Sequence, residues 1–182
     1  MKGPNASFLY DISREPWPPL SYPAFAATQH LLHMGLQAIG KFKLKEPFEP
    51  QWAEVPLWLS SRGLTTGPIH SPGGAYEVTL DLISHQVGCA TSWGFSGRYK
   101  LESMSVAEFV ERLFDILRKA GIDTSINLRP QEVPNAIPFD HALMRMVAST
   151  IALTICGLVP LINLFIRVAI GFDSFDGFST KH

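Results

Sequence analysis

The first pattern along the chain is a helical one. Between residues 24 and 41, apolar side chains recur at helical spacing: Phe25, Leu32, Leu36 and Ile39. This spacing is typical of an amphipathic helix that buries one stripe. Thr28 lies where it can help to start the helix, and Gly40 lies where it can help to end it. We therefore predict a helix over 24–41.

A second helix is predicted from its capping residues. Ser105 and Glu108 form a capping box, in which the serine oxygen accepts a hydrogen bond from a free backbone N–H and the glutamate reaches back to the cap. Gly121 stands where a C-terminal glycine cap belongs. The apolar stripe between them consists of Val106, Phe109, Val110, Leu113, Leu117 and Ala120.

Strands are predicted where apolar and polar side chains alternate. In the clearest run, Tyr76, Val78, Leu80 and Leu82 alternate with Glu77, Thr79 and Asp81. A turn near 84–85 returns the chain along 87–92. A second turn, at 94–97, leads into 99–101. This part of the chain is therefore predicted to be an antiparallel meander.

Two further segments complete the predicted sheet. The apolar run over 55–60 contains Pro56, which suits an edge strand. After the second helix, residues 122–128 alternate again. The order helix, strand, meander, helix, strand predicts an α+β domain, with a mostly antiparallel sheet and two main helices packed on it.

The composition fits one domain and excludes one class of partner. A chain of 182 residues is long enough to bury a core. With a net charge of -1, the chain has no basic face for a nucleic acid, and the cluster Lys41, Lys43 and Lys45 fits a solvated helix end. Cys89 and Cys156 are too far apart for a zinc pattern. The N-terminus lacks an apolar secretory signal, so the domain is predicted to be cytoplasmic.

The last part of the chain has a different composition. Residues 146–166 carry no charged side chain. This uncharged run is long enough for a membrane-spanning helix. Pro160 and Asn163 would be tolerated in such a helix only at some cost. The alternatives to a membrane span are an apolar helix docked on the domain and a shift of the reading frame near Asp140.

Several short motifs occur in order between residues 17 and 140. They are Trp17-Pro18 with Leu20 and Tyr22; Thr28, His33, Gln37 and Gly40-Lys41; Trp52 with Val55-Pro56-Leu57; Arg62-Gly63-Leu64-Thr65-Thr66; Asp81 and His85; Ser105-Val106-Ala107 with Phe109; Gly121-Ile122; Glu132-Val133; and Ile137-Pro138-Phe139. Together they resemble a bacterial family known as domain of unknown function 5996. The resemblance implies a domain over 17–140, after an irregular proline-rich stretch at 1–16 and before an apolar tail at 141–182.

The chain departs from the family in two places. Family members usually carry a tryptophan two residues after the helix histidine, where this chain has Gly35. They also continue past Phe139 with a charged and aromatic second half, whereas nothing from His141 onward resembles the family. A site that draws residues from that second half would be incomplete in this chain.

Two groups of polar side chains are candidates for a site. The helix row, His33, Gln37 and Lys41, is spaced i, i+4, i+8 and so shares one face; a histidine near a lysine suits proton transfer. The turn group, Arg62, Thr65 and Thr66, lies in a glycine-rich turn where a guanidinium and hydroxyls suit a carboxylate or phosphate. The competing interpretations are a solvent-facing helix surface and a structural turn whose arginine pairs with a nearby acid.

The sequence supports two hypotheses about function. The first is a cytoplasmic ligand-binding or enzymatic domain for a small anionic ligand, with His33 and Lys41 as catalytic candidates and the remaining candidates, Gln37, Arg62, Thr65 and Thr66, as ligand-binding residues. The second is a non-catalytic interaction module, held at the membrane through 146–166, or a truncated inactive product. No metal-ligand spacing and no dinucleotide, Walker or hydrolase fingerprint is present, so no metal or cofactor is expected.

Overall fold

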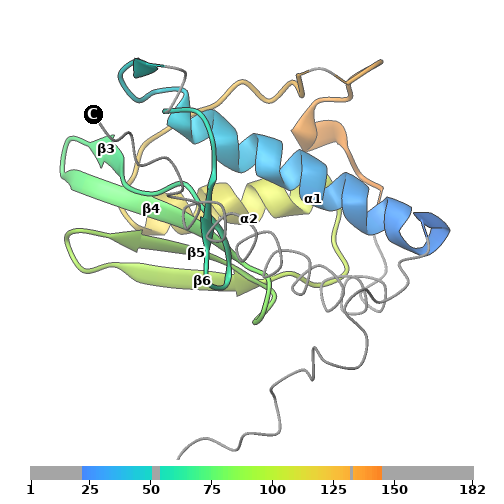
Figure 1. Cartoon of the computed structure of the whole chain (residues 1–182), viewed down its shortest axis with the longest axis horizontal. Coiled ribbons are helices and arrows are strands. Elements are labelled where there is room, and N and C mark those ends of the chain that lie inside the picture. The colour runs from blue at the N-terminus through green and yellow to red at the C-terminus, as the bar shows by residue number, and fades with distance from the viewer. Residues whose placement is uncertain (1–21, 51–53, 132, 145–182) are drawn as a thin grey trace, which may run out of the picture.

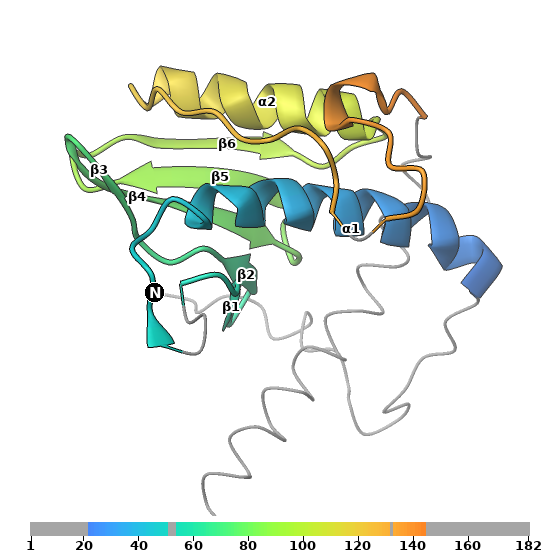
Figure 2. The same ribbon diagram turned by 90° about the horizontal axis from the view of Figure 1, so that it is seen from above.

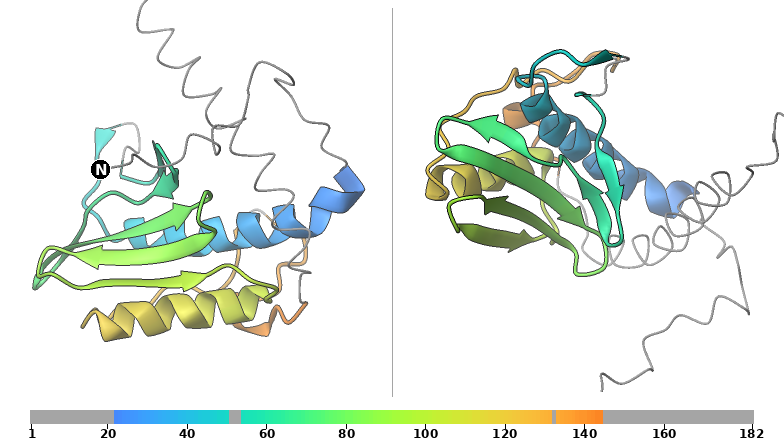
Figure 3. Two further views of the ribbon diagram at one scale, coloured as in Figure 1. Left: turned by 90° about the horizontal axis from the view of Figure 1, so that it is seen from below. Right: turned by 60° about the vertical axis from the view of Figure 1, so that its left-hand side comes forward.

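The computed structural model describes residues 22–50, 54–131 and 133–144. Two helices, α1 (Tyr22–Lys43) and α2 (Val106–Lys119), lie on the same side of one sheet (Figure 1, Figure 2). No described helix covers the other side of the sheet (Figure 3). The predicted α+β class, with a mostly antiparallel sheet and two main helices, is confirmed. The predicted apolar C-terminal helix lies outside the described residues.

The described residues form one sheet of six strands. They are β1 (Trp58–Ser60), β2 (Gly63–Thr65), β3 (Ile69–Ser71), β4 (Gly74–Asp81), β5 (Gln86–Thr91) and β6 (Ser96–Lys100). Their order is β1-β2-β4-β5-β6, and β3 pairs with β4 beside this path. Every pair is antiparallel. The longest strand, β4, therefore forms the centre of the domain.

One row of apolar side chains crosses the sheet on the face that the helices cover. The register aligns Leu59, Leu64, Leu80, Val87 and Tyr99 on five neighbouring strands, and we call these residues the core row. Cross-strand partners share one face of a sheet, so all five point toward the helices. Val87 and Leu80 are fully covered, whereas Leu59, at the β1 edge, is 42% exposed.

The second helix begins and ends as its sequence predicts. The Glu108 N–H donates to Ser105 Oγ at 3.1 Å, and the Ser105 N–H donates to Glu108 Oε2 at 2.8 Å, so the capping box is confirmed. Past the C-terminal end, Gly121 adopts a φ of 76°, a left-handed conformation that glycine adopts without strain.

The first helix is longer than its sequence predicts. Gly40 does not end it, because the helix runs on to Lys43. A single interior glycine costs a helix only about 0.5–1 kcal/mol relative to alanine. Phe42, which lies beyond the glycine, is fully buried and holds the last turn against the core.

The predicted strand over 122–128 is wrong. Ile122 is buried and Ile126 and Leu128 are half-buried, so the alternation is real, but no strand of the described residues pairs with this segment. Instead, Leu128 O accepts a hydrogen bond from the Phe139 N–H at 2.9 Å. The alternating pattern of this segment therefore reflects burial on one side and does not indicate a strand of the sheet.

The alternation of apolar and polar side chains did not predict two short strands. The turn-rich segment after Arg62 contains β2, and β3 follows Pro68. Gly63 opens β2 with a φ of 152°, and a methyl group there would collide with Leu80 O. A strand of three residues is too short to show an alternating pattern in the sequence. Both segments are identified as strands only by their pairing with β4.

Candidate functional site

The helix row faces a segment that crosses α1 near the end of the domain. This crossing segment, residues 128–131 and 133–142, runs past α1 to the start of α2 (Figure 2). Gln37 holds it by two hydrogen bonds: Nε2 donates to Gln131 O and Oε1 accepts from the Gln131 N–H, each at 3.0 Å. This pairing fixes the orientation of the Gln37 amide.

The fixed amide determines the tautomer of His33. Gln37 Nε2 lies 3.2 Å from His33 Nε2, and an amide NH₂ can only donate. In this arrangement His33 Nε2 therefore accepts the hydrogen bond, and Nδ1 is the ring nitrogen that is left as a donor. His33 is exposed and offers an N–H donor, while its basic nitrogen is engaged by Gln37.

Lys41 is the buried member of the helix row. It is only 7% exposed, and its Nζ lies 5.9 Å from the centroid of the Phe139 ring. Among residues 22–50, 54–131 and 133–144, no carboxylate lies within 4.0 Å of this ammonium. Burial lowers the pKa of Lys41 from its ordinary value, because desolvation disfavours the charged form. Within the described chain, the ammonium thus has a ring beside it but no counter-charge.

The predicted solvated helix end is wrong for two of its three lysines. Lys43 is 5% exposed, with Nζ 5.6 Å from the centroid of Trp58, and Lys41 is buried in the same way. Only Lys45 is exposed, and it donates to Thr124 Oγ1 at 2.8 Å. Long lysine stems cover apolar surface and rings attract the cation, which sequence spacing does not reveal.

The turn group is engaged by β4. Arg62 Nε lies 2.6 Å from Asp81 Oδ2, and the Arg62 side chain is 53% exposed. The Thr65 hydroxyl donates to the Glu77 carboxylate. Thr66 is buried; its hydroxyl donates to Gly67 O at 2.7 Å and accepts from the Val78 N–H at 3.0 Å. Each of the three side chains thus already has a partner within the protein.

The two groups are not brought together. No hydrogen bond or ion pair joins the helix row to the turn group within the part of the chain that the structure describes. Within the helix row, His33 and Lys41 are two turns apart, which is about 12 Å along a helix. A single proton transfer therefore cannot use both of them directly.

The Arg62 pair predicts a pH effect that NMR can test. Burial raises the pKa of Asp81, but the Arg62 guanidinium and the N–H groups of Ser84 and Ile83 outweigh it and lower the pKa to about 2. Arg62→Ala should therefore raise the pKa of Asp81, as measured by a carboxyl carbon titration. Because the folded pKa is depressed, the stability that it contributes is present above about pH 4 and is lost as pH falls toward 2.

The control for this titration is Arg98→Ala. Arg98 is exposed on β6, away from Asp81 in the strand order, so its removal should leave the pKa of Asp81 at about 2. If the pKa of Asp81 is unchanged in Arg62→Ala, the backbone N–H groups alone are sufficient to lower it.

One polar pair was missed by sequence reasoning. Glu46 Oε1 accepts the His70 N–H at 2.8 Å, and Glu46 Oε2 lies 2.5 Å from His70 Nδ1. His70 is 81% exposed at its side chain, so Nε2 faces solvent. Next to this pair, burial and then the charges of Cys89 and Glu46 raise the pKa of Tyr76 to about 12. The partners are far apart in sequence and His70 lies on an unpredicted strand, so no local signal was present.

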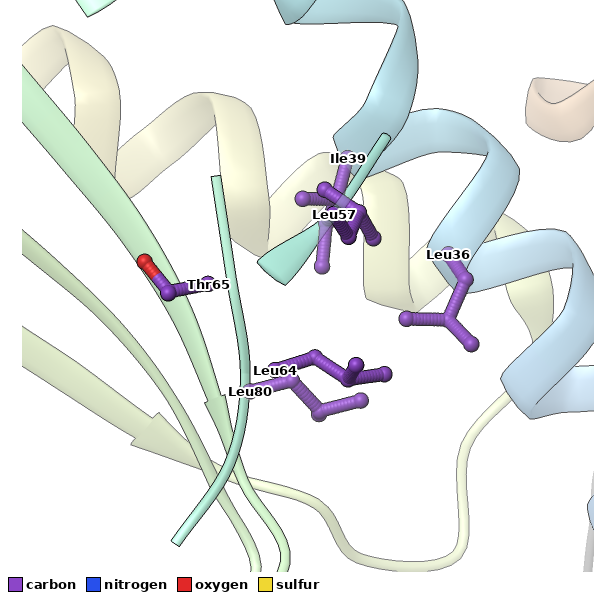
Figure 4. A pocket seen from close by; sticks show the side chains of 6 residues that line it. All are labelled: Leu36, Ile39, Leu57, Leu64, Thr65 and Leu80. Atoms are coloured by element: carbon purple, nitrogen blue, oxygen red, sulfur yellow. The ribbon is translucent and has the colours of Figure 1, made fainter. Parts of the chain in front are cut away.

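An apolar hollow lies between α1 and the β1–β2 side of the sheet. Its walls are Leu36, Ile39, Leu57, Leu64, Thr65 and Leu80 (Figure 4). None of these side chains carries a charge, so the hollow has no group that fits an anion.

Two kinds of feature are absent from the described residues. No group of three or more His, Cys, Asp or Glu side chains within them is placed to hold a metal ion. None of their helices is long and apolar enough to cross a membrane.

Comparison with known proteins identifies a family and no individual relative. A family model described as a family of unknown function (DUF5996) matches residues 17–146. No curated protein and no solved structure matches the chain.

Proposed function

The chain belongs to the DUF5996 family, and because that family has no assigned function, we propose one from the geometry: the domain binds a small anionic ligand at the Lys41 ammonium. The observation that carries this proposal is the burial of Lys41 without a carboxylate among the described residues. A buried charge is costly unless it is paired, and an anion would supply the missing partner.

The ligand has to be small and to bind at one end of the helix row. Lys41 lies in the last turns of α1, where Phe139 of the crossing segment covers it. Gln37 is occupied by Gln131, and His33 is two turns away, so neither shares a compact ligand with Lys41. An ion of the size of phosphate or acetate meets these limits, and a charge-assisted contact would hold it.

The turn group is a weaker candidate for the same ligand. Arg62 Nε already pairs with the Asp81 carboxylate, and Thr65 donates to the Glu77 carboxylate. An anion at this turn would meet two negative charges, whereas none lies within 4.0 Å of Lys41 in the described chain.

The proposal predicts an anion-dependent rise in melting temperature. The full chain is melted with phosphate, sulfate or acetate at constant ionic strength. At a free ligand concentration of 100 times Kd, binding adds about 2.7 kcal/mol, or roughly 5–10 °C for a chain of this size. Lys41→Met should abolish the rise, because methionine keeps the apolar stem and removes the charge.

The matched control is Lys43→Met, since Lys43 is a second buried lysine beside a ring on the same helical turn. It should keep the anion-dependent rise. A rise that persists in Lys41→Met, or no rise with any of the three anions in the unaltered chain, would contradict the proposal.

A further inference from the structure

The strand β6 forms an outer edge of the sheet. It is the last strand in the order β1-β2-β4-β5-β6 and lies outermost on its side of the sheet (Figure 1). It has five residues, whereas β1, at the other end of the order, has three. The outer side of β3 is engaged differently, because its His70 N–H donates to Glu46 Oε1 at 2.8 Å. Among the described strands, β6 thus offers the longest edge for a further strand.

The backbone groups on the outer side of β6 have no partner within the described chain. The Thr91 N–H donates to Phe95 O at 3.0 Å, and the Leu101 N–H donates to His85 O at 2.8 Å. In an antiparallel pair, hydrogen-bonded and non-hydrogen-bonded residues alternate, so every second residue between these two bonds points its N–H and C=O away from β5. The residues that do so are Ser96, Arg98 and Lys100. No described group bonds to their backbone, so this edge can template another strand.

The side chains of β6 differ in character on the two faces of the sheet. Arg98 and Lys100 are exposed on the face that no described helix covers, and no described carboxylate lies within 4.0 Å of either cation. Tyr99, between them, points toward the helices and ends the core row. A strand added beside β6 would therefore meet positive charge on one face and the end of the core on the other.

We propose that β6 binds an extended acidic segment of a partner protein as an additional antiparallel strand. The described strand pairs of this sheet are all antiparallel, which favours the same orientation for the added strand. Cross-strand partners share one face, so acidic side chains at alternate positions would lie beside Arg98 and Lys100. The apolar side chains between them would extend the core row beyond Tyr99. Backbone hydrogen bonds would supply affinity, and the two cations would supply specificity.

The same cations disfavour a second copy of this chain as the occupant. Two β6 strands related by a two-fold axis and centred on Arg98 would place the two arginines directly opposite each other on one face. Like charges in that position are destabilising, and charged side chains on an edge strand are a common barrier to self-pairing. An acidic strand turns this repulsion into attraction.

The first test uses a short blocked peptide in which glutamate alternates with valine, with binding to the full chain measured by fluorescence anisotropy. In the proposed pairing, the glutamates lie opposite Arg98 and Lys100 and point their N–H groups at β6. Methylating the glutamate nitrogens should therefore weaken binding by about ten-fold or more, since several hydrogen bonds are lost. The matched control peptide is methylated on the valine nitrogens, which point away from β6, and its affinity should change by less than about two-fold.

The second test reverses the charges of the edge. In the variant that combines Arg98→Glu with Lys100→Glu, affinity for the glutamate peptide should fall by about ten-fold. The same variant should instead bind a peptide in which lysine alternates with valine, which the unaltered chain should not prefer. Circular dichroism confirms that the variant is folded.

Four results would overturn the proposal. Equal weakening by the two methylation patterns would mean that the peptide does not pair with β6 as a strand. A preference for glutamate that survives the charge reversal would place the peptide on another surface. A monomeric chain that binds neither peptide would mean that the edge accepts no such strand. A chain that sediments as a dimer and binds neither peptide would assign the edge to a second copy.

Discussion

Replacing Phe139 with alanine should lower the free energy of unfolding by about 3–5 kcal/mol. Phe139 is fully buried and opens the short helix η3 (Phe139–His141), which packs against α2. Its N–H donates to Leu128 O at 2.9 Å, and three residues later Ala142 O accepts the Ala107 N–H at 3.2 Å. The ring therefore anchors the crossing segment to the core, and truncating it leaves a cavity between segment and helices.

The measurement is urea unfolding of the full chain, followed by circular dichroism. The control is Ile137→Ala, since Ile137 lies two residues earlier on the same segment and is mostly exposed. That change should alter the free energy of unfolding by less than about 0.5 kcal/mol. Equal effects of the two substitutions would show that the crossing segment is not part of the cooperative domain.

Gly35→Trp should destabilise the domain by about 3 kcal/mol or more, even though the family resemblance places a tryptophan at this position. Gly35 is buried where α1 meets α2, and a methyl group there would approach Phe109 Cζ to 2.9 Å. An indole is far larger than a methyl group, so the helices would have to separate. In this chain the Phe109 ring occupies the space next to the glycine.

Two controls make this second prediction specific. Gly40→Ala should be neutral or stabilising by up to about 1 kcal/mol, because a methyl group at Gly40 meets nothing within 4 Å and alanine favours the helix. Combining Gly35→Trp with Phe109→Ala should cost less than the sum of the two single changes, since the small residue makes room for the indole. Strict additivity in unfolding experiments would show that the two positions do not share space.

Rules that use only neighbouring residues correctly predicted the parts of the fold that neighbouring residues determine. The capping box at Ser105 needs only neighbouring residues, and the alternation in β4 reports a strand that is covered on one face. The same alternation failed over 122–128, because a strand also needs a partner and the sequence does not show where partners are. The first helix passed Gly40 because Phe42 is held by tertiary packing.

The candidate site shows the same limit. Helical spacing correctly puts His33 and Gln37 on one face, where they hydrogen-bond. The burial of Lys41 depends on Phe139, which is nearly a hundred positions away, so spacing alone favoured a solvated lysine. Arg62 pairs with Asp81 across the β2–β4 ladder. From the sequence, the expectation was only that the arginine pairs with some nearby acid.

The decisive test of the anion site is a titration of the Lys41 ammonium. In the full chain with carbon-labelled lysine, the Lys41 signal is assigned as the one that Lys41→Met removes. Its pKa should lie below the ordinary value of 10.5, and saturating phosphate should raise it, because a bound anion favours the charged form. A Lys41 pKa that phosphate leaves unchanged would contradict an anion site at this residue.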